Sequence, residues 1–170
     1  MIVWFSQEEL NDYKRIAALR NDPKIAAGIH TNKFSLRHGD LEINILGVHG
    51  EAAVSEILGV DFDRRALMEG DGNIADLWYK GRSVQVKMIT HKSGDLFFNS
   101  LSDFRADIAV LVVPCSANSV NVVGGISRKK FAKLCGTKNF GYGDRVTVPQ
   151  NLLTPLEAIK RHLDSVGDLA

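Results

Sequence analysis

The chain has 170 residues, of which 45% are hydrophobic and 24% charged, and its formal net charge is +1. A chain of this length and composition is expected to form one domain with a buried core, and disorder is not expected. The near-neutral charge argues against a protein that coats nucleic acid non-specifically, and it favours a focused cleft over a broad basic surface.

Two further patterns concern the cellular compartment. No apolar run approaches the roughly 20 residues of a transmembrane helix, and the first residues lack a signal-peptide pattern. Cys115 and Cys135 stand apart without a Cys-x-x-Cys spacing, so we expect reduced thiols that take no part in catalysis. We therefore expect a cytoplasmic protein that does not bind membranes.

The first forty residues predict a helix followed by a connecting arm. Ser6 and Glu9 form a Ser-x-x-Glu capping box at the start of the helix. The Asn21-Asp22-Pro23 segment is expected to stop this helix, because proline rarely continues one. Residues 24–40 contain two histidines and several basic residues, and we interpret them as the arm.

A strand and a second helix are expected next. Residues 41–46 alternate between apolar and polar like a strand, and the Gly47-Val48-His49-Gly50 segment is expected to end it. Residues 51–58 predict a helix that Gly59 closes. Glu51 then lies in the first turn of that helix, where the helix dipole favours a carboxylate.

A β-hairpin is the most informative feature of the chain. Residues 74–79 and 83–89 alternate as two strands, and a two-residue turn at Lys80-Gly81 joins them, with glycine supplying a positive φ. Residues directly opposite each other in such a hairpin share a face. The pairs that follow from this turn are Tyr79–Arg82, Leu77–Val84 and Asp76–Gln85.

The two faces of the hairpin differ in character. Because side chains alternate along a strand, Lys87 shares a face with Gln85 and Asp76. An acid, an amide and a lysine therefore converge on one side of the hairpin. The opposite side is apolar and is expected to face the core, and it contains Ala75, Leu77, Tyr79, Val84, Val86 and Met88.

The second half of the chain predicts two strands and two helices. Residues 107–113 form an apolar run after Asp107, typical of a strand buried on both faces, and residues 119–123 are expected to be its neighbour. Ser127 is expected to start a basic helix whose inner side contains Phe131, Leu134 and Cys135. Residues 154–157 start a last helix with an apolar stripe of Leu156, Ile159 and Leu163.

This order of elements predicts an α/β fold with a mixed central β-sheet flanked by helices. We expect a single domain over residues 1–170. Its parts are the N-terminal helix and arm (1–40), the core (41–156) and the C-terminal helix (154–165).

The polar face of the hairpin needs a second acid to hold a divalent cation. Glu51 is the natural candidate, because the glycines before it allow a close approach of its backbone. Magnesium prefers oxygen ligands, commonly one or two carboxylates together with water and phosphate oxygens. Glu51 and Asp76 supply carboxylates and Gln85 an amide oxygen, so the sequence predicts a Mg²⁺ site, with Mn²⁺ as a substitute.

In these features the chain resembles the PD-(D/E)XK nuclease superfamily, also called restriction-endonuclease-like. The matching residues are Glu51 after a glycine on an early helix, segment 70–76 entering a hairpin, and Gln85-Val-Lys87 on its second strand. The buried strand 107–113 and the segment 122–126 fit the same topology.

The chain is especially similar to small phage-encoded members of this superfamily. In those proteins a Gly-x-x-Gly-Glu segment precedes the hairpin, and a Val-Pro…Leu-x-Pro-Leu stretch closes the chain. Here the closing stretch covers residues 148–156, and the resemblance extends over residues 41–156.

The resemblance implies a restriction-endonuclease-like core and roles for the site residues. Glu51 and Asp76 would bind magnesium, Gln85 would take the position usually held by Asp or Glu, and Lys87 would act on the attacking water and the scissile phosphate. The implied activity is metal-dependent endonucleolytic hydrolysis of DNA, duplex or branched, by a homodimer in the cytoplasm of a bacterial host. We expect Lys87 to act electrostatically, because a lysine among carboxylates stays protonated.

Gln85 departs from the family pattern by one negative charge, which weakens metal binding. Two alternatives to a nuclease follow from this departure. One is a catalytically decayed nuclease scaffold that acts as a nucleic-acid-binding or assembly protein, and the other is an interaction module whose polar hairpin is only surface. Among nucleases, restriction-like, junction-resolving and repair roles are all compatible with the sequence.

Several residues near the expected site have a structural interpretation as well. Asp71 is expected to be a turn residue, with the alternative that it supplements or replaces Asp76 as a ligand. His49 and His91 are expected to be structural, with the alternative that one contacts phosphate, since no Cys/His cluster supports zinc. Trp78 is expected to pack under a helix rather than stack on a base.

A basic cluster lies at the start of the helix after Ser127. Its members are Arg128, Lys129, Lys130 and Lys133. They form either a solvated outer face or a nucleic-acid-binding patch in which free helix N–H groups assist phosphate binding. The sequence favours neither interpretation.

Overall fold

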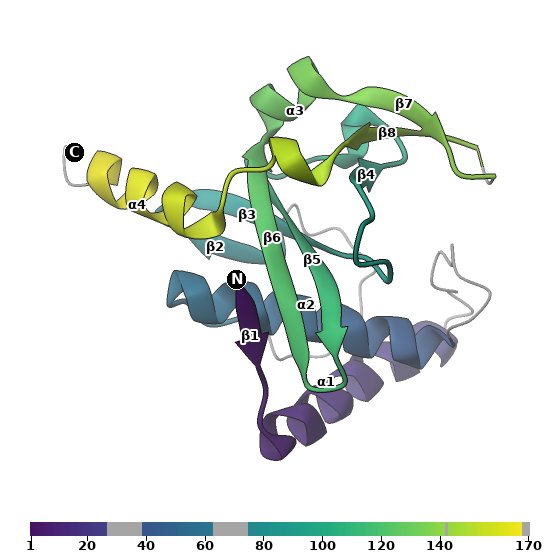
Figure 1. Cartoon of the computed structure of the whole chain (residues 1–170). Helices are drawn as coiled ribbons and strands as arrows, with labels where there is room; N and C mark the ends of the chain where they lie inside the picture. Colours follow the sequence, from purple (N-terminus) through teal and green to yellow (C-terminus); the bar gives the residue numbers. More distant parts are fainter. Residues whose placement is uncertain (27–38, 63–74, 142, 168–170) are drawn as a thin grey trace.

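The computed structural model describes residues 1–26, 39–62, 75–141 and 143–167 (Figure 1). The helices are α1 (Gln7–Ala26), α2 (Asp40–Leu58), α3 (Arg128–Leu134) and α4 (Leu156–Gly167), with 3-10 turns η1 (Leu101–Asp103) and η2 (Gln150–Leu152). The strands are β1 (Ile2–Trp4), β2 (Leu77–Tyr79), β3 (Arg82–Met88), β4 (Leu96–Phe98), β5 (Ile108–Ser116), β6 (Ser119–Ser127), β7 (Gly136–Asn139) and β8 (Asp144–Val148).

A mixed five-stranded sheet forms the centre of the fold. Its strand order is β1-β6-β5-β3-β2, with β3 parallel to β5 and the other neighbouring pairs antiparallel. A smaller antiparallel sheet has the order β4-β8-β7. The expected α/β fold with a mixed central sheet and flanking helices is therefore confirmed at this level.

Strand β5 is buried on both faces, as its continuous apolar run predicts. Val110 and Val112 belong to one core cluster, whereas Leu111 and Val113 belong to the other. The predicted neighbour of β5 is also confirmed, because β6 pairs with it antiparallel.

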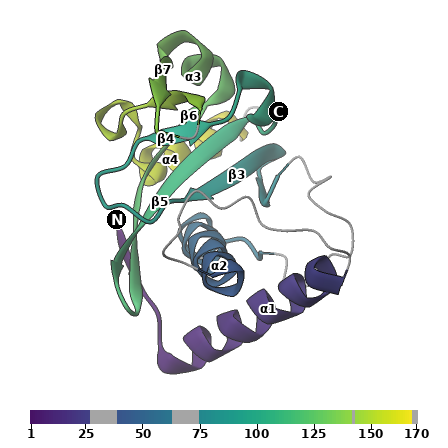
Figure 2. The same ribbon diagram turned by 90° about the vertical axis from the view of Figure 1, so that its right-hand side faces the viewer.

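Each face of the central sheet has its own cover. We name the α2 face the one that carries Val84, Val110 and Val112, whose core cluster also includes side chains of α1, α2 and α4. We name the α3 face the one that carries Leu111 and Val113, whose cluster includes side chains of α3 and the second sheet. Figure 2 shows α1 and α2 on one side of the central sheet and α3 with the second sheet on the other.

The start of helix α1 follows the sequence expectation, but its end does not. Ser6 N–H donates to Glu9 Oε2 at 2.7 Å and Glu9 N–H donates to Ser6 Oγ at 3.2 Å, which confirms the capping box. The side chain and backbone of Ser6 hold the pKa of Glu9 below its usual value. The predicted stop at Asn21-Asp22-Pro23 is wrong, because α1 continues to Ala26. The proline removes one helical hydrogen bond, a cost that the packing of α1 on α2 offsets.

Residues 41–46 form part of α2, so the prediction of a strand there is wrong. The helical stripe becomes visible only over a longer window, where Ile45, Val48 and Ala52 pack into the core on the α2 face. Gly47 and Gly50, read as the end of a strand, lie inside the helix. The predicted closure is confirmed: Gly59 adopts φ 73° and its N–H donates to Ser55 and Glu56 carbonyls.

The predicted hairpin is confirmed in turn and register, with a shorter first strand and a second strand that begins and ends one residue earlier. Lys80 and Gly81 adopt φ values of 48° and 72°, which gives the expected two-residue turn. Leu77 pairs with Val84 and Tyr79 with Arg82. Tyr79 also donates a hydrogen bond to Asp164, which ties the hairpin to α4. Burial, followed by this bond, raises the pKa of Tyr79 to about 12.

The two C-terminal helices largely match their predicted patterns. Ser127 caps α3 by accepting a hydrogen bond from Lys130 N–H, and Phe131 is fully buried, but Leu134 is 42% exposed and not on the inner side as expected. Helix α3 ends after only seven residues, which leaves Leu134 beyond the core. The stripe of α4 is confirmed by the packing of Leu156, Ile159 and Leu163 against the core. None of the helices in the described part of the chain is both long and apolar enough to span a membrane.

Candidate functional site

Asp76 lies at an open edge of strand β3. The pairing of β2 with β3 ends at Leu77 and Val84, and no strand of the described residues continues along this edge. Asp76 lies where a longer neighbouring strand would pair with β3. Its N–H donates to the Val84 carbonyl at 3.0 Å, and its Oδ2 accepts from Val86 N–H at 2.6 Å. The carboxylate is exposed and held by backbone. We call the stretch of β3 from Gln85 to Lys87, with Asp76, the β3 edge.

Glu51 approaches the β3 edge from the α2 face. Helix α2 crosses β3 at Gly50, where an added Cβ would lie 3.3 Å from the side chains of both Val86 and Met88. The glycine thus allows the close approach that the sequence predicted. The predicted place of Glu51 in a first helical turn is wrong, because α2 begins at Asp40. The helix dipole consequently gives no support to a charge at Glu51.

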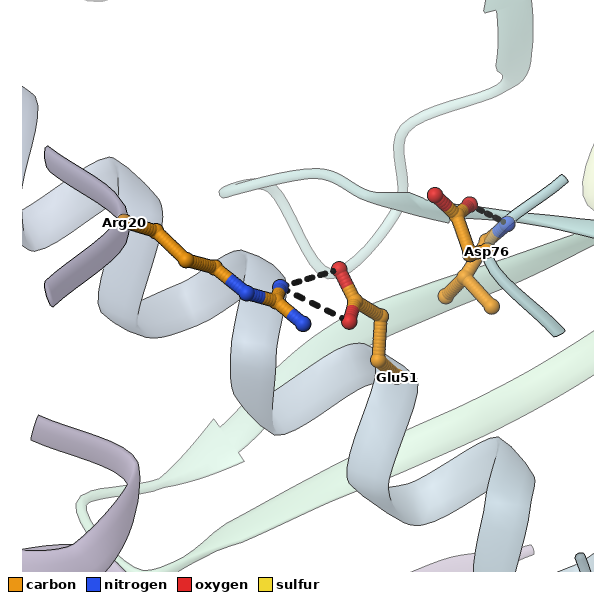
Figure 3. A network of polar contacts seen from close by, with 4 residues as sticks. Arg20, Glu51 and Asp76 are labelled. Atoms are coloured by element: carbon orange, nitrogen blue, oxygen red, sulfur yellow. Dashed lines mark hydrogen bonds and ion pairs between the residues drawn. The ribbon is translucent and has the colours of Figure 1, made fainter. Parts of the chain in front are cut away.

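Arg20 of α1 binds Glu51, a contact that sequence reasoning missed. Arg20 Nη1 donates to Oε1 at 3.0 Å and to Oε2 at 2.9 Å, with side-chain exposures of 19% for Arg20 and 16% for Glu51. In the view of Figure 3, Glu51 lies between Arg20 and Asp76. One sequence signal exists, because Arg20 extends the buried stripe of Tyr13 and Ile16, where a charged residue needs a partner.

Gln85 and Lys87 lie on the other face of the sheet from Glu51. In the parallel pair β3–β5, Gln85 is opposite Ala109 and Lys87 opposite Leu111, and both partners belong to the core on the α3 face. Lys87 Nζ lies 5.0 Å from the centroid of the Phe98 ring. The side-chain oxygen of Gln85 is buried and has no hydrogen-bond partner in the structure.

The structure therefore arranges the four predicted site residues around one edge of one strand. Glu51 comes from the α2 face, Gln85 and Lys87 project from the α3 face, and Asp76 is bound to the backbone between them. This differs from the predicted arrangement, in which Glu51 joins Asp76, Gln85 and Lys87 on the polar face of the hairpin. The sequence could not show that α2 packs on the opposite face.

The oxygen atoms at the β3 edge match a hard cation in chemical type. Two carboxylates and an amide oxygen are ligands that magnesium accepts, and the unpartnered Gln85 oxygen is free of competing hydrogen bonds. The acid content is modest, because no group of three or more His, Cys, Asp or Glu side chains within the described ranges is placed to hold a metal ion. Arg20 also places a positive charge against Glu51. Asp71, the alternative ligand, falls outside the described residues.

Three other candidates occupy different surroundings. His49 is buried 5.3 Å from the Phe5 ring and 5.6 Å from the Tyr13 ring, and burial, with a smaller effect of Lys14, lowers its pKa to about 4. His91 is exposed. Trp78 is 60% exposed, so the expectation that it packs under a helix is wrong.

Two features of the basic cluster bear on its interpretation. Arg128, Lys129, Lys130 and Lys133 are all exposed. Helix α3 has only seven residues and the Lys130 N–H is already bonded to Ser127 Oγ, so free helix N–H groups give little support to phosphate binding there. Any anion binding by this cluster depends on its side chains.

Asp107 is a structural residue at the start of β5. Its carboxylate accepts hydrogen bonds from the N–H and the Oγ of Ser83, at 2.9 and 2.8 Å. These bonds hold the pKa of Asp107 below its usual value. Asp107 directly precedes β5, as expected, and its bonds to Ser83 tie the start of β5 to β3.

Comparisons of the chain with known protein families, with curated proteins and with solved structures found no match.

Proposed function

We propose that the protein is a magnesium-dependent endodeoxyribonuclease of the PD-(D/E)XK type, with its site at the β3 edge. The observation that carries the proposal is the position of Asp76, whose exposed carboxylate is fixed by Val86 N–H at an open strand edge. Glu51 directly follows Gly50, the residue at which α2 crosses β3, and Lys87 directly follows Val86 on β3. Acids and a lysine around one strand edge are the elements that phosphodiester hydrolysis requires.

Each residue has a role in the proposed site. Asp76 and Glu51 would hold Mg²⁺ or Mn²⁺, and Gln85, which projects from the opposite face to Glu51, would add its unpartnered oxygen round the open strand edge. The bound cation would acidify a water molecule and neutralise charge on the phosphate. Lys87 would bind a phosphate oxygen and stabilise its developing charge. Its ammonium group lies over the Phe98 ring, a cation–π contact that helps to position it.

A second candidate function is a catalytically decayed nuclease scaffold that binds nucleic acid. The observation that favours it is the bond of Arg20 to both carboxylate oxygens of Glu51. An arginine bonded to both carboxylate oxygens competes with a cation for them, and Gln85 already reduces the negative charge of the site. In that case the protein would bind DNA and leave it intact.

Cleavage of supercoiled plasmid separates the two candidates. With Mg²⁺ or Mn²⁺, the nuclease proposal predicts nicked and linear products, which Asp76→Asn and Lys87→Ala abolish. Asp61→Asn is the matched control, because this exposed acid lies outside the β3 edge and its variant should cleave like wild type. Binding without cleavage would favour the decayed scaffold. Neither binding nor cleavage would favour an interaction module.

A further inference from the structure

The net charge of +1 conceals a strong separation of charge along the chain. Residues 80–150 contain eleven Lys or Arg and four Asp or Glu, whereas the rest of the chain contains ten and sixteen. Helices α2 and α3 show the contrast most clearly. Helix α2 has four acidic residues and no Lys or Arg, whereas α3 has four Lys or Arg and no acidic residue.

The fold places these two helices on opposite faces of the central sheet. Helix α2 covers the α2 face, and α3 packs through Phe131 into the core of the α3 face. In both Figure 1 and Figure 2, α3 and β7 lie at the end of the molecule opposite α1. The most acidic helix and the most basic helix therefore lie on opposite sides of the sheet, and we call the side with α3 the basic side.

The second sheet extends the basic side. Lys138 of β7 pairs directly with Arg145 of β8, so the two cationic side chains share a face of this sheet. Like charges in this position repel each other, and Asp95 offsets part of the repulsion through a 3.2 Å contact with Lys138. Phe140, at the tip of the same hairpin, is 39% exposed. Cations beside an exposed aromatic ring are typical of surfaces that bind nucleic acid.

Trp78 and Lys87 of the β2–β3 hairpin also face the basic side. Trp78 pairs with Ser83, and Ser83 shares its face with Lys87 because side chains alternate along β3. Trp78 is thus an exposed aromatic residue on the same face as the lysine of the proposed site. Arg128 lies nearby, since its N–H donates to the Asp107 carbonyl and Asp107 binds Ser83.

We propose that duplex DNA binds the outer surface of the layer that covers the α3 face, with its phosphates on α3 and on the β7–β8 hairpin. This basic surface comprises Arg128, Lys129, Lys130, Lys133, Lys138 and Arg145. Charge complementarity selects DNA as the occupant, because a duplex carries closely spaced phosphates that a line of cations neutralises. This proposal rests on the proposed function, because it assumes that Lys87 contacts the scissile phosphate of the bound DNA. Glu51, on the α2 face, would then approach the phosphate from behind the β3 edge, where Asp76 lies.

Fluorescence anisotropy with a short labelled duplex in EDTA tests the surface without cleavage. The test variant is Lys129→Glu with Lys133→Glu, and the control is Lys14→Glu with Arg161→Glu, all four residues being exposed. Both variants change the net charge equally. We expect the test variant to bind at least about tenfold more weakly, and its slope of log K against log salt to fall by about 2. The control should bind like wild type.

The outcomes separate this proposal from the proposed function. Equal losses in both variants, or no loss in either, would overturn the basic surface even if the protein cleaves plasmid. Selective loss in the test variant would support it even if no cleavage occurs. Stronger binding to anionic vesicles or to RNA duplex than to DNA would also overturn it, and circular dichroism of both variants verifies that they are folded.

Discussion

Arg20 Nη1 donates hydrogen bonds to both carboxylate oxygens of Glu51, at 3.0 and 2.9 Å, in a contact that is largely shielded from solvent. It connects α1, which lies outside the resemblance to known nucleases, with the proposed metal ligand on α2. The pair has two consequences, because it holds Glu51 in place and also neutralises its charge. The predictions below begin with this pair.

Arg20→Ala should raise the affinity for Mn²⁺ and lower the stability of the protein. The substitution removes two hydrogen bonds from the Glu51 oxygens and a positive charge from beside the cation, so we expect about tenfold tighter binding by calorimetry. Loss of this contact should cost about 1–3 kcal/mol of the free energy of unfolding in urea. Arg15→Ala is the control, since Arg15 is exposed on the same helix and pairs with Asp12. Unchanged or weaker Mn²⁺ binding in Arg20→Ala would contradict Glu51 as a ligand.

Gln85→Glu should strengthen metal binding by restoring the acid of the family pattern. The buried oxygen of Gln85 has no hydrogen-bond partner, so a carboxylate there adds charge directly at the proposed site. We expect about tenfold tighter Mg²⁺ binding and lower stability without metal, because a buried charge is then unpaired. Gln85→Leu should weaken Mg²⁺ binding and stabilise the metal-free protein by about 1 kcal/mol, because it removes the unpartnered oxygen. Equal Mg²⁺ affinity in wild type and both variants would place the cation elsewhere.

Trp78 should report DNA binding through its fluorescence. The chain has two tryptophans, Trp4 and Trp78, and they are similarly exposed, at 63% and 60%. In Trp4→Phe, the emission of Trp78 should be quenched when duplex DNA binds the basic side. In Trp78→Phe, the emission of Trp4 should stay unchanged, because β1 forms the far edge of the central sheet. A response of Trp4 equal to that of Trp78 would refute this placement of the DNA.

His49 should make the protein less stable as the pH falls. Its pKa is about 4 in the folded protein and near 6.5 in the unfolded chain, mainly because burial disfavours the charged ring. The unfolded state therefore binds the proton first, and stability is lost between about pH 6.5 and about pH 4, by up to about 3 kcal/mol.

Urea unfolding across this pH range measures the effect. His49→Phe should flatten the dependence relative to wild type, whereas His91→Phe, at an exposed position, should leave it unchanged. Identical pH profiles for wild type and His49→Phe would show that His49 is not held neutral by the core.

The sequence predicted the local features whose physical cause is local. The Lys80-Gly81 turn and the alternation around it determine the register of the hairpin, and the Ser6–Glu9 box determines the start of α1. Residues 41–46 were misread because a six-residue alternation fits a strand and a helix equally well. Packing of Ile45 and Val48 against the sheet decides for the helix, and only the tertiary structure shows that packing.

The candidate site was predictable in its members and not in its geometry. Asp76, Gln85 and Lys87 follow from the hairpin pattern, but their relation to Glu51 depends on which face of the sheet α2 covers. Arg20 was missed because it is distant in sequence from the site, and Lys138 and Arg145 were not joined to the predicted basic cluster because only the fold places the second sheet beside α3. Both depend on contacts between distant segments.

Single-turnover hydrolysis of an end-labelled duplex is the most direct test of a metal-dependent nuclease site at the β3 edge. Wild type should cut the duplex with Mg²⁺ or Mn²⁺ and leave it intact in EDTA, and Asp76→Asn should bind the same duplex without cutting it. Cutting by Asp76→Asn at the wild-type rate, or the absence of any cutting by wild type that binds DNA and metal, would contradict the account.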